Sequence, residues 1–208
     1  IRDRYPNPGY PEYEAAANLA GAKPIPYKLT IEDEFRVDPD KLAELITPKT
    51  KLVVLNTPHN PCGSVMKYDE VKALVELSED HGFYILIDEI YRPFLFDEEK
   101  HYSPLSIKGD LERIVIADGF SKRYAMTGWR IGYAAARKEL IERMLRIHSY
   151  IQACAPSISQ RAYLAALRGP QGFVSKMREI FMRRRDLVLS KLREHGIDVK
   201  GAKGAFYV

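Results

Sequence analysis

The stretch FYILIDEIY, residues 83–91, decides the fold class of this chain. It opens as a continuous run of apolar residues, which predicts a strand over residues 83–90. A strand that is apolar on both sides is typical of a parallel sheet whose two faces are both covered by helices. Asp88 and Tyr91 come at the end of this run. We therefore expect the strand to bring a carboxylate and a phenol to one edge of the sheet.

Working outward, the pattern of a short apolar run between helical segments recurs along the chain. Strands are expected over residues 51–57, 113–117 and 130–136, and helices over residues 12–21, 69–82, 138–151, 157–167 and 171–194. Apolar residues at helical spacing and a following glycine support the helix over 69–82. This alternation predicts an α/β fold with a mostly parallel sheet and helices on both faces.

The last expected helix, 171–194, is much longer than an average helix and is expected to lead from one domain into another. We therefore expect a large domain over residues 1–170 that lacks its N-terminal part. Residues 171–208 would be a linking helix and the truncated start of a small α+β domain. The chain begins at Ile1 and ends in an apolar run, 204–208, that reads as a strand cut short. We expect it to be a fragment.

Composition excludes several classes of function. The chain has 208 residues, of which 46% are hydrophobic and 29% charged, as in an ordinary soluble globular domain. A net charge of +4 is small for this size, so neither a nucleic-acid nor a membrane partner is expected. No run of about 18 apolar residues occurs. The arginine run 183–185 shares its helix with acidic residues, which favours a solvated face.

The two cysteines, Cys62 and Cys154, lie far apart and have no histidine or cysteine neighbours at metal-ligand spacing. Neither a disulfide nor a metal site is expected. A reducing, cytoplasmic location fits this pattern best.

Polar groups follow three of the expected strands. Residues 52–55 lead to Asn60, residues 84–87 lead to Asp88, and residues 114–116 lead to Lys122. In open α/β sheets, ligands bind at the carboxyl ends of the strands. An amide, a carboxylate and an amine are therefore expected at one edge of the sheet.

These are the groups that a pyridoxal phosphate site needs. A lysine forms the imine, a carboxylate keeps the ring nitrogen protonated, and further donors serve the ring oxygen. The phosphate needs a cation, and Arg130, beyond the turn at Gly128, can supply a two-pronged donor.

The stretch GFSKRYAMTGWRIG, residues 119–132, resembles the lysine signature of the class I and II aminotransferases of fold type I. NTPHNPCG (56–63) and DEIY (88–91) are similar to two other cofactor motifs of that family, in the same order. PNPGYPEYEAAANLAGAKP (6–24) resembles the segment that carries an aromatic ring over the cofactor. The resemblance thus covers essentially the whole chain.

The resemblance implies a role for each matching residue. Lys122 would hold pyridoxal 5'-phosphate as a Schiff base and move the proton at the substrate's α-carbon. Asp88 would pair with the ring nitrogen. The remaining groups would be Tyr91 and Asn60 on the ring oxygen, Arg130 on the phosphate and Tyr10 stacked on the ring. The Asn60–Pro61 bond is expected to be cis, as it resembles a family position where that occurs.

Two residues depart from the family pattern. Cys62 stands where many members have threonine, and Gly119 stands where many have a serine that touches the phosphate. The second departure leaves the phosphate one donor short. The family's phosphate loop precedes Tyr10 and its substrate-carboxylate arginine follows Val208, so both are expected outside this chain.

The implied activity is transamination between an amino acid and a 2-oxo acid, as in the aspartate aminotransferase branch, with aspartate and 2-oxoglutarate as one candidate pair. A homodimer is implied too. Two alternatives remain open. The same site can run other reactions of this cofactor, as in a C–S lyase or a decarboxylase, and a similar domain serves as a cofactor sensor in some transcription regulators.

Each single residue also has a plain structural interpretation. Lys122 could be a solvated loop residue, Asp88 a turn cap, and Arg130 half of a surface ion pair. Tyr10 could pack on a neighbouring helix. A lone histidine such as His59 is more often a structural group than an acid or base, and it is given no role.

Overall fold

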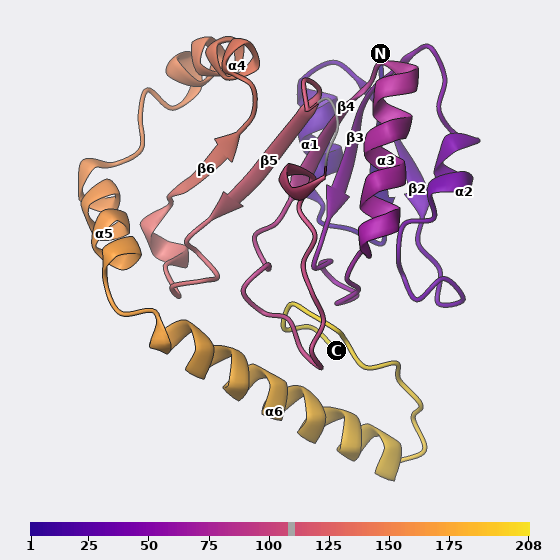
Figure 1. Cartoon of the computed structure of the whole chain (residues 1–208), viewed down its shortest axis with the longest axis vertical. Coiled ribbons are helices and arrows are strands. Elements are labelled where there is room, and N and C mark those ends of the chain that lie inside the picture. The colour runs from indigo at the N-terminus through magenta and orange to yellow at the C-terminus, as the bar shows by residue number, and fades with distance from the viewer. Residues whose placement is uncertain (108–110) are drawn as a thin grey trace.

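A six-stranded sheet organises the chain, whose computed structural model describes residues 1–107 and 111–208 (Figure 1). The strand order is β2-β1-β3-β4-β5-β6. The strands are β1 (Arg2–Asn7), β2 (Lys23–Lys28), β3 (Thr50–Asn56), β4 (Tyr84–Asp88), β5 (Ile114–Gly119) and β6 (Gly132–Ala135). The pairings from β2 through β5 are parallel, and β6 alone runs antiparallel to its neighbour β5. The expectation of a mostly parallel sheet is confirmed.

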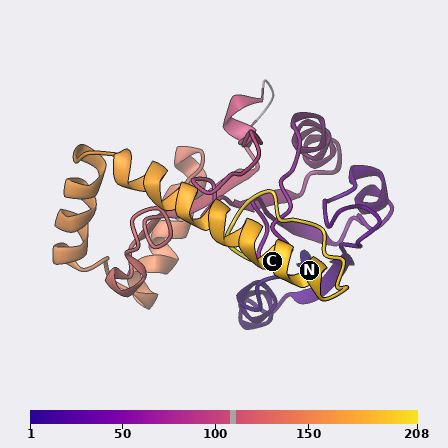
Figure 2. The same cartoon turned by 90° about the horizontal axis from the view of Figure 1, so that it is seen from below.

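Helices cover both faces of this sheet. The helices of the described residues are α1 (Glu12–Leu19), α2 (Pro39–Ala43), α3 (Tyr68–His81), α4 (Lys138–Ile151), α5 (Ser157–Arg168) and α6 (Gly172–Glu194), with short 3-10 turns η1 (Pro104–Ser106) and η2 (Thr127–Trp129). Helix α3 lies on one face of the sheet and α1 on the other (Figures 1 and 2). Helix α3 is capped at its C-terminus by Gly82, whose φ of 69° is the left-handed conformation that glycine adopts without strain.

The main core lies between α3 and the central strands. Phe83, Ile85 and Ile87 of the β4 segment pack with Val71 and Leu74 of α3, and all five side chains are buried. In the parallel register, Asn56 of β3 stands opposite Asp88 of β4, and Asp88 opposite Ala117 of β5. The carboxyl ends of these three strands are therefore level with one another.

Two strands, β1 and β2, are not expected from the sequence. Proline cannot donate a ladder hydrogen bond, and the segments RDRYPN and KPIPYK both contain it. The structure accommodates Pro24 and Pro26 because β2 is an edge strand. In β1, the pairing with β3 covers Arg2 to Arg4 and ends before Pro6.

Two expectations about strands are wrong. The strand expected over 130–136 begins only at Gly132, because η2 precedes it and Arg130 has a left-handed φ of 49°. The final segment, 197–208, contains no regular helix or strand. Its one β-bridge joins Gly204 to Leu95.

Helix α6 runs along the lower edge of the molecule and leads to this final segment (Figures 1 and 2). Arg185 of α6 is buried and donates to both carboxylate oxygens of Asp97, at 2.7 and 2.8 Å, and to the carbonyl of Ala202 at 2.9 Å. The expected solvated arginine run is therefore wrong for Arg185, although Arg183 and Arg184 are exposed.

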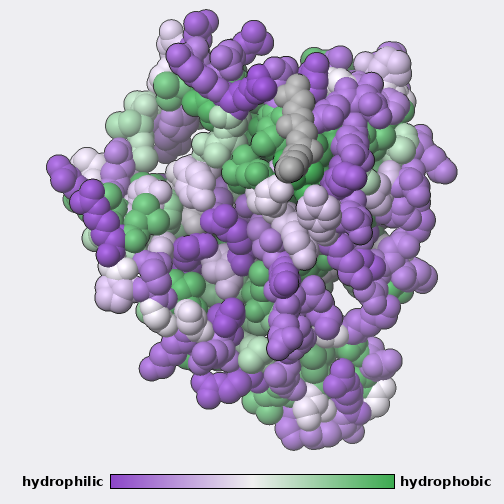
Figure 3. All heavy atoms as spheres, in the orientation of Figure 1, coloured by the Kyte–Doolittle hydropathy of each residue, from purple (hydrophilic) through white to green (hydrophobic). Residues whose placement is uncertain are grey.

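Hydrophilic side chains cover most of the face seen in Figure 1, with hydrophobic ones in smaller patches between them (Figure 3). Within the described part of the chain, no helix has the length and apolar character needed to cross a membrane. The same residues contain no cluster of side chains suited to hold a metal ion.

Candidate functional site

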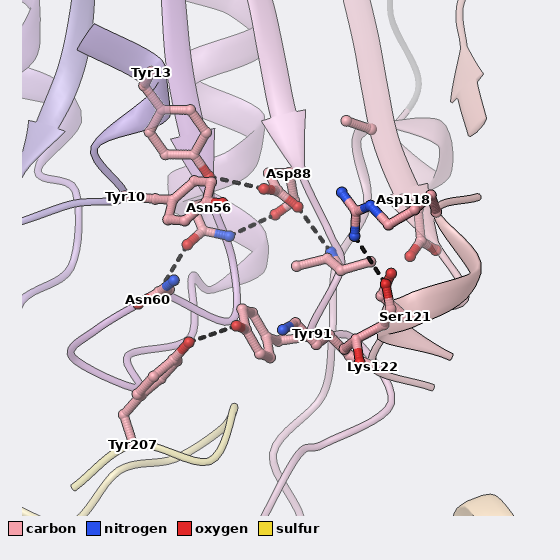
Figure 4. Close-up of a pocket in the computed structure, with 14 residues that line it drawn as sticks. Tyr10, Tyr13, Asn56, Asn60, Asp88, Tyr91, Asp118, Ser121, Lys122 and Tyr207 are labelled. Atoms are coloured by element: carbon pink, nitrogen blue, oxygen red, sulfur yellow. Dashed lines mark hydrogen bonds between the residues drawn. The ribbon is translucent and has the colours of Figure 1, made fainter. Parts of the chain in front are cut away.

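A pocket of about 410 Å³ opens at the carboxyl ends of β3, β4 and β5 (Figure 4). Its walls include every residue that the sequence nominates for a site: Tyr10, Asn60, Asp88, Tyr91, Lys122 and Arg130. The side chains come from segments up to 120 residues apart because parallel strands place their carboxyl ends at one edge. The expectation that these groups meet there agrees with the structure.

Asp88 ends β4 and is held on both carboxylate oxygens. Its Oδ1 accepts the backbone N–H of Ile90 at 3.0 Å, and its Oδ2 accepts the hydroxyl of Tyr13 at 2.8 Å. Burial raises the pKa of the Asp88 carboxyl, and these two hydrogen bonds partly oppose that rise. Asp88 thus caps a turn and also faces the pocket.

Two asparagines hold the adjoining loop against the end of β4. Asn56 donates its side-chain amide to the carbonyl of Asp88 at 2.9 Å, and its Oδ1 accepts the backbone N–H of Asn60 at 2.7 Å. The Asn60–Pro61 bond is cis, as expected. The neighbouring His59 is buried, and burial lowers its pKa to about 4, so it is neutral at ordinary pH.

Lys122 follows β5 and reaches into the pocket beside Tyr91 (Figure 4). Its Nζ lies 5.7 Å from the ring centres of both Tyr91 and Phe206. The lysine is partly buried and has aromatic faces beside it, which does not fit the interpretation of a solvated loop residue.

Tyr91 makes the shortest side-chain contact in the pocket wall among the bonds described there. Its hydroxyl lies 2.5 Å from the hydroxyl of Tyr207, and the two rings meet edge to face at 5.6 Å. Burial is the main cause that raises the pKa of Tyr91. Tyr91 is therefore protonated over the whole physiological range.

Arg130 and Tyr10 form the more open side of the pocket. The guanidinium of Arg130 is exposed and donates to the carbonyl of Thr127 at 2.9 Å, which orients it at the end of η2. Tyr10 is 40% exposed and its ring meets that of Tyr13 edge to face at 5.7 Å. Both side chains keep polar groups available to a ligand.

Eight further residues that line the pocket were not nominated from the sequence as site residues, among them Tyr13, Asn56, Asp118 and Tyr207. Asn56 is the last residue of β3, and Asp118 lies one residue before the end of β5. A search for polar residues at the carboxyl ends of the expected strands would therefore find both. Asp118 pairs with Arg92 at 3.0 Å and accepts the hydroxyl of Tyr133 at 2.8 Å. Tyr13 and Tyr207 carry no local signal, since only tertiary contacts bring them to the pocket.

Packing explains the departure at Gly119. A side-chain carbon there would lie 3.2 Å from the Cα of Gly132 and 3.3 Å from the carbonyl oxygen of Ile131, which is tighter than ordinary contact. The close approach of β5 to β6 therefore favours glycine at this position.

The fold and this pocket define the class of protein. The family model described as "Aminotransferase class I and II" matches residues 4–208. The chain belongs to the class I and II aminotransferase family.

Particular relatives sharpen this assignment. The aspartate aminotransferase of Pyrococcus abyssi (strain GE5 / Orsay) is 39% identical over 205 residues, which are 98% of this chain and 53% of that protein. The aromatic-amino-acid aminotransferase 2 of Thermococcus litoralis is 39% identical over 98% of this chain and 53% of its own length. The chain thus spans about half the length of the curated relatives it matches.

Solved structures agree with this. The aromatic aminotransferase of Pyrococcus horikoshii OT3 matches with a TM-score of 0.94 and 36% identity, over 98% of this chain and 55% of that one. The aspartate aminotransferase of Thermus thermophilus with maleate matches with a TM-score of 0.93 and 35% identity, over 98% and 53%. The fold is therefore that of the aminotransferases.

Proposed function

We propose that the protein is a pyridoxal-phosphate-dependent aminotransferase that moves an amino group between an amino acid and a 2-oxo acid. The observation that carries this proposal is the meeting of the Lys122 amine, the Asp88 carboxylate and the Arg130 guanidinium in one pocket. Aspartate with 2-oxoglutarate is the first substrate pair to test, because relatives at 39% identity are named aspartate aminotransferases.

The donor set fits this cofactor. When bound, pyridoxal phosphate supplies a ring that withdraws electrons from the substrate's α-carbon. Asp88, already fixed by Tyr13 and Ile90, can hold a proton at the ring nitrogen. Arg130 supplies a two-pronged cation for the phosphate.

The remaining proposed roles follow from position in the pocket. Tyr91 and Asn60 face the space beside Lys122 and can donate hydrogen bonds to the ring oxygen. Tyr10 offers an aromatic face for stacking. Lys122 attaches the cofactor covalently, and its amine afterwards carries a proton to and from the α-carbon.

The proposal extends to organisation. Residues 1–170 form the cofactor-binding large domain, and residues 171–208 form the linking helix and the start of a small domain. The protein works as a homodimer in the cytoplasm. Sedimentation velocity tests the dimer, and a single species with the mass of one chain contradicts it.

Absorbance and trapping test the cofactor assignment. The protein mixed with pyridoxal phosphate should acquire a visible absorption band, and borohydride reduction followed by peptide mass spectrometry should locate the cofactor on Lys122. Lys122→Ala should lose both signals. Lys138→Ala is the matched control, because Lys138 lies at the start of α4, outside the pocket. Covalent cofactor on Lys122→Ala defeats the assignment.

Product analysis then distinguishes the reactions. Transamination converts 2-oxoglutarate to glutamate in step with loss of the donor amino acid. Release of ammonia or carbon dioxide in place of glutamate indicates an elimination or a decarboxylation.

A further inference from the structure

Tyr207 belongs to a segment that is fixed on two loops of the pocket. The backbone N–H groups of Lys203 and Gly204 both donate to the carbonyl of Gly63 at 2.9 Å. The N–H of Ala205 donates to the carbonyl of Phe94, also at 2.9 Å. Gly63 closes the loop that carries Asn60, and Phe94 follows Tyr91. The final segment is therefore held to both loops by its main chain.

Close packing reinforces these hydrogen bonds. A side-chain carbon on Gly204 would lie 2.7 Å from Cβ of Pro58, and one on Gly63 would lie 2.3 Å from Cβ of Ala202. Real Cβ atoms do not approach that closely, so only glycine allows this contact. Phe206 packs edge to face on Tyr91 at 5.1 Å. Tyr207 is thus placed with little freedom.

The two phenols, Tyr91 and Tyr207, share one short hydrogen bond of 2.5 Å (Figure 4). A phenol has a single O–H donor but also accepts through its oxygen. If Tyr91 gives its proton to another acceptor in the pocket, the bond to Tyr207 persists only with Tyr207 as the donor. The group that Tyr91 faces in the pocket therefore decides which of the two hydroxyls donates the hydrogen bond.

We propose that Tyr207 is a positioning residue that donates to Tyr91 and thereby directs the Tyr91 proton to the ring oxygen of the cofactor. The proposal rests on the proposed function. A hydroxyl that accepts a hydrogen bond becomes a stronger donor, because a chain of hydrogen bonds polarises its members. Tyr207 therefore strengthens the donation by Tyr91 and lowers the negative charge on the ring oxygen.

This charge has a measurable effect. Negative charge on the ring oxygen favours a proton on the nearby nitrogen through which Lys122 holds the cofactor. Removal of the Tyr207 hydroxyl leaves more charge on that oxygen. The pH at which this nitrogen loses its proton must then rise.

The experiment titrates the visible absorption of the protein loaded with pyridoxal phosphate. Tyr207→Phe should raise the pH midpoint by about 0.5 units, a fraction of one hydrogen bond's net contribution. Tyr91→Phe should raise it further. The double variant should match Tyr91→Phe, because Tyr207 acts only through Tyr91.

Tyr124→Phe is the matched control. Tyr124 bonds the side chain of Gln171 at 2.8 Å outside the pocket, so its loss should leave the midpoint unchanged. Urea unfolding of each variant without cofactor measures the purely structural cost of the lost hydroxyl.

The outcomes separate the two proposals. Absence of a visible band in the unaltered protein overturns the proposed function. A normal band whose midpoint does not move in Tyr207→Phe overturns the role of Tyr207 alone, as does a shift of equal size on the Tyr91→Phe background. A destabilised Tyr207→Phe protein with an unmoved midpoint assigns Tyr207 to packing and also overturns the inference.

Discussion

Asp88 sits in surroundings that disfavour its charge while two donors hold it in place. Its raised pKa means that the carboxyl contributes stability below its unfolded pKa and that this stability is lost as the pH rises through the folded pKa. A carboxyl placed where burial raises its pKa is typical of a functional site. A charged Asp88 therefore lowers the stability of the folded protein, although the proposed binding of the cofactor needs that charge.

Replacement of Asp88 by asparagine separates the two effects. Without cofactor, Asp88→Asn should unfold at higher urea than the unaltered protein at pH 7, with the two converging in acid. Its affinity for pyridoxal phosphate should fall about tenfold or more, because a charge-assisted hydrogen bond is lost. The exposed Asp198→Asn is the control. Equal urea midpoints for Asp88→Asn and its parent at pH 7 contradict the account.

The buried His59 should make the free energy of unfolding depend on pH in the acid range. Its folded pKa of about 4 is depressed by burial, so its contribution is present above the unfolded pKa of about 6.5 and is lost as the pH falls. The free energy of unfolding should drop by about 3 kcal/mol between pH 6.5 and 4 on account of this group. Urea titrations across that range check it. His59→Asn should remove this part of the slope and His81→Asn should not. Parallel curves for His59→Asn and its parent refute the assignment.

At the scale of single residues, the sequence predicts the position of those pocket residues that lie in a local sequence motif. Lys122, Asp88 and Asn60 each follow an apolar run, and this local pattern is enough to place them at the pocket. Tyr13 and Tyr207 escape prediction because their partners, Asp88 and Tyr91, lie 75 and 116 residues away in sequence.

At the scale of elements, the loop that carries Asn60 depends on the glycine that closes it. Gly63 has a φ of +66° and leaves no space for a side chain against Ala202. This contact joins the loop after β3 to the final segment. A change there should loosen two walls of the pocket together.

Gly63→Ala tests this joint. The added methyl group meets both backbone strain and overpacking, so the free energy of unfolding should fall by about 2–3 kcal/mol. Hydrogen exchange should quicken at residues 203–205, whose amides bond to Gly63 and Phe94. Gly172→Ala is the control, because nothing lies within 4 Å of that position at the start of α6. Unchanged hydrogen exchange at residues 203–205 would contradict the proposed coupling between the Gly63 loop and the final segment.

Element prediction succeeds where one physical signal dominates. The apolar runs of β3, β4 and β5 and the amphipathic α4 give clear patterns, and α4 spans the expected residues 138–151. It fails at β1 and β2, where proline argues against strands and pairing with neighbours overrides that preference. The final segment fails for a similar reason, since its shape comes from the loops it contacts.

At the scale of the whole molecule, α6 ties the final segment to the loop after β4. Arg185 makes this connection, because its guanidinium reaches Asp97 and Ala202 at once. A lysine can occupy one of these positions but not both in the same planar geometry. The tie therefore depends on arginine itself.

Arg185→Lys should lower the free energy of unfolding by about 2 kcal/mol, because the Asp97 carboxylate and the Ala202 carbonyl lose part of their donors. Affinity for pyridoxal phosphate should weaken as well, because Tyr207 is less firmly placed. Isothermal titration and urea unfolding measure the two effects. The exposed Arg183→Lys should change neither. If Arg185→Lys is as stable as the unaltered protein, Arg185 does not stabilise the contact between α6 and the final segment.

The bond between Tyr91 and Tyr207 also has a consequence for biosynthesis. The two residues are 116 positions apart, and a ribosome adds about 5–20 residues each second. The segments that carry Asp88 and Lys122 therefore leave the ribosome several seconds before Tyr207, which completes the wall of the pocket. A nascent chain holds Lys122 in an open cleft during that interval, and the arrival of residues 203–207 closes the wall beside it.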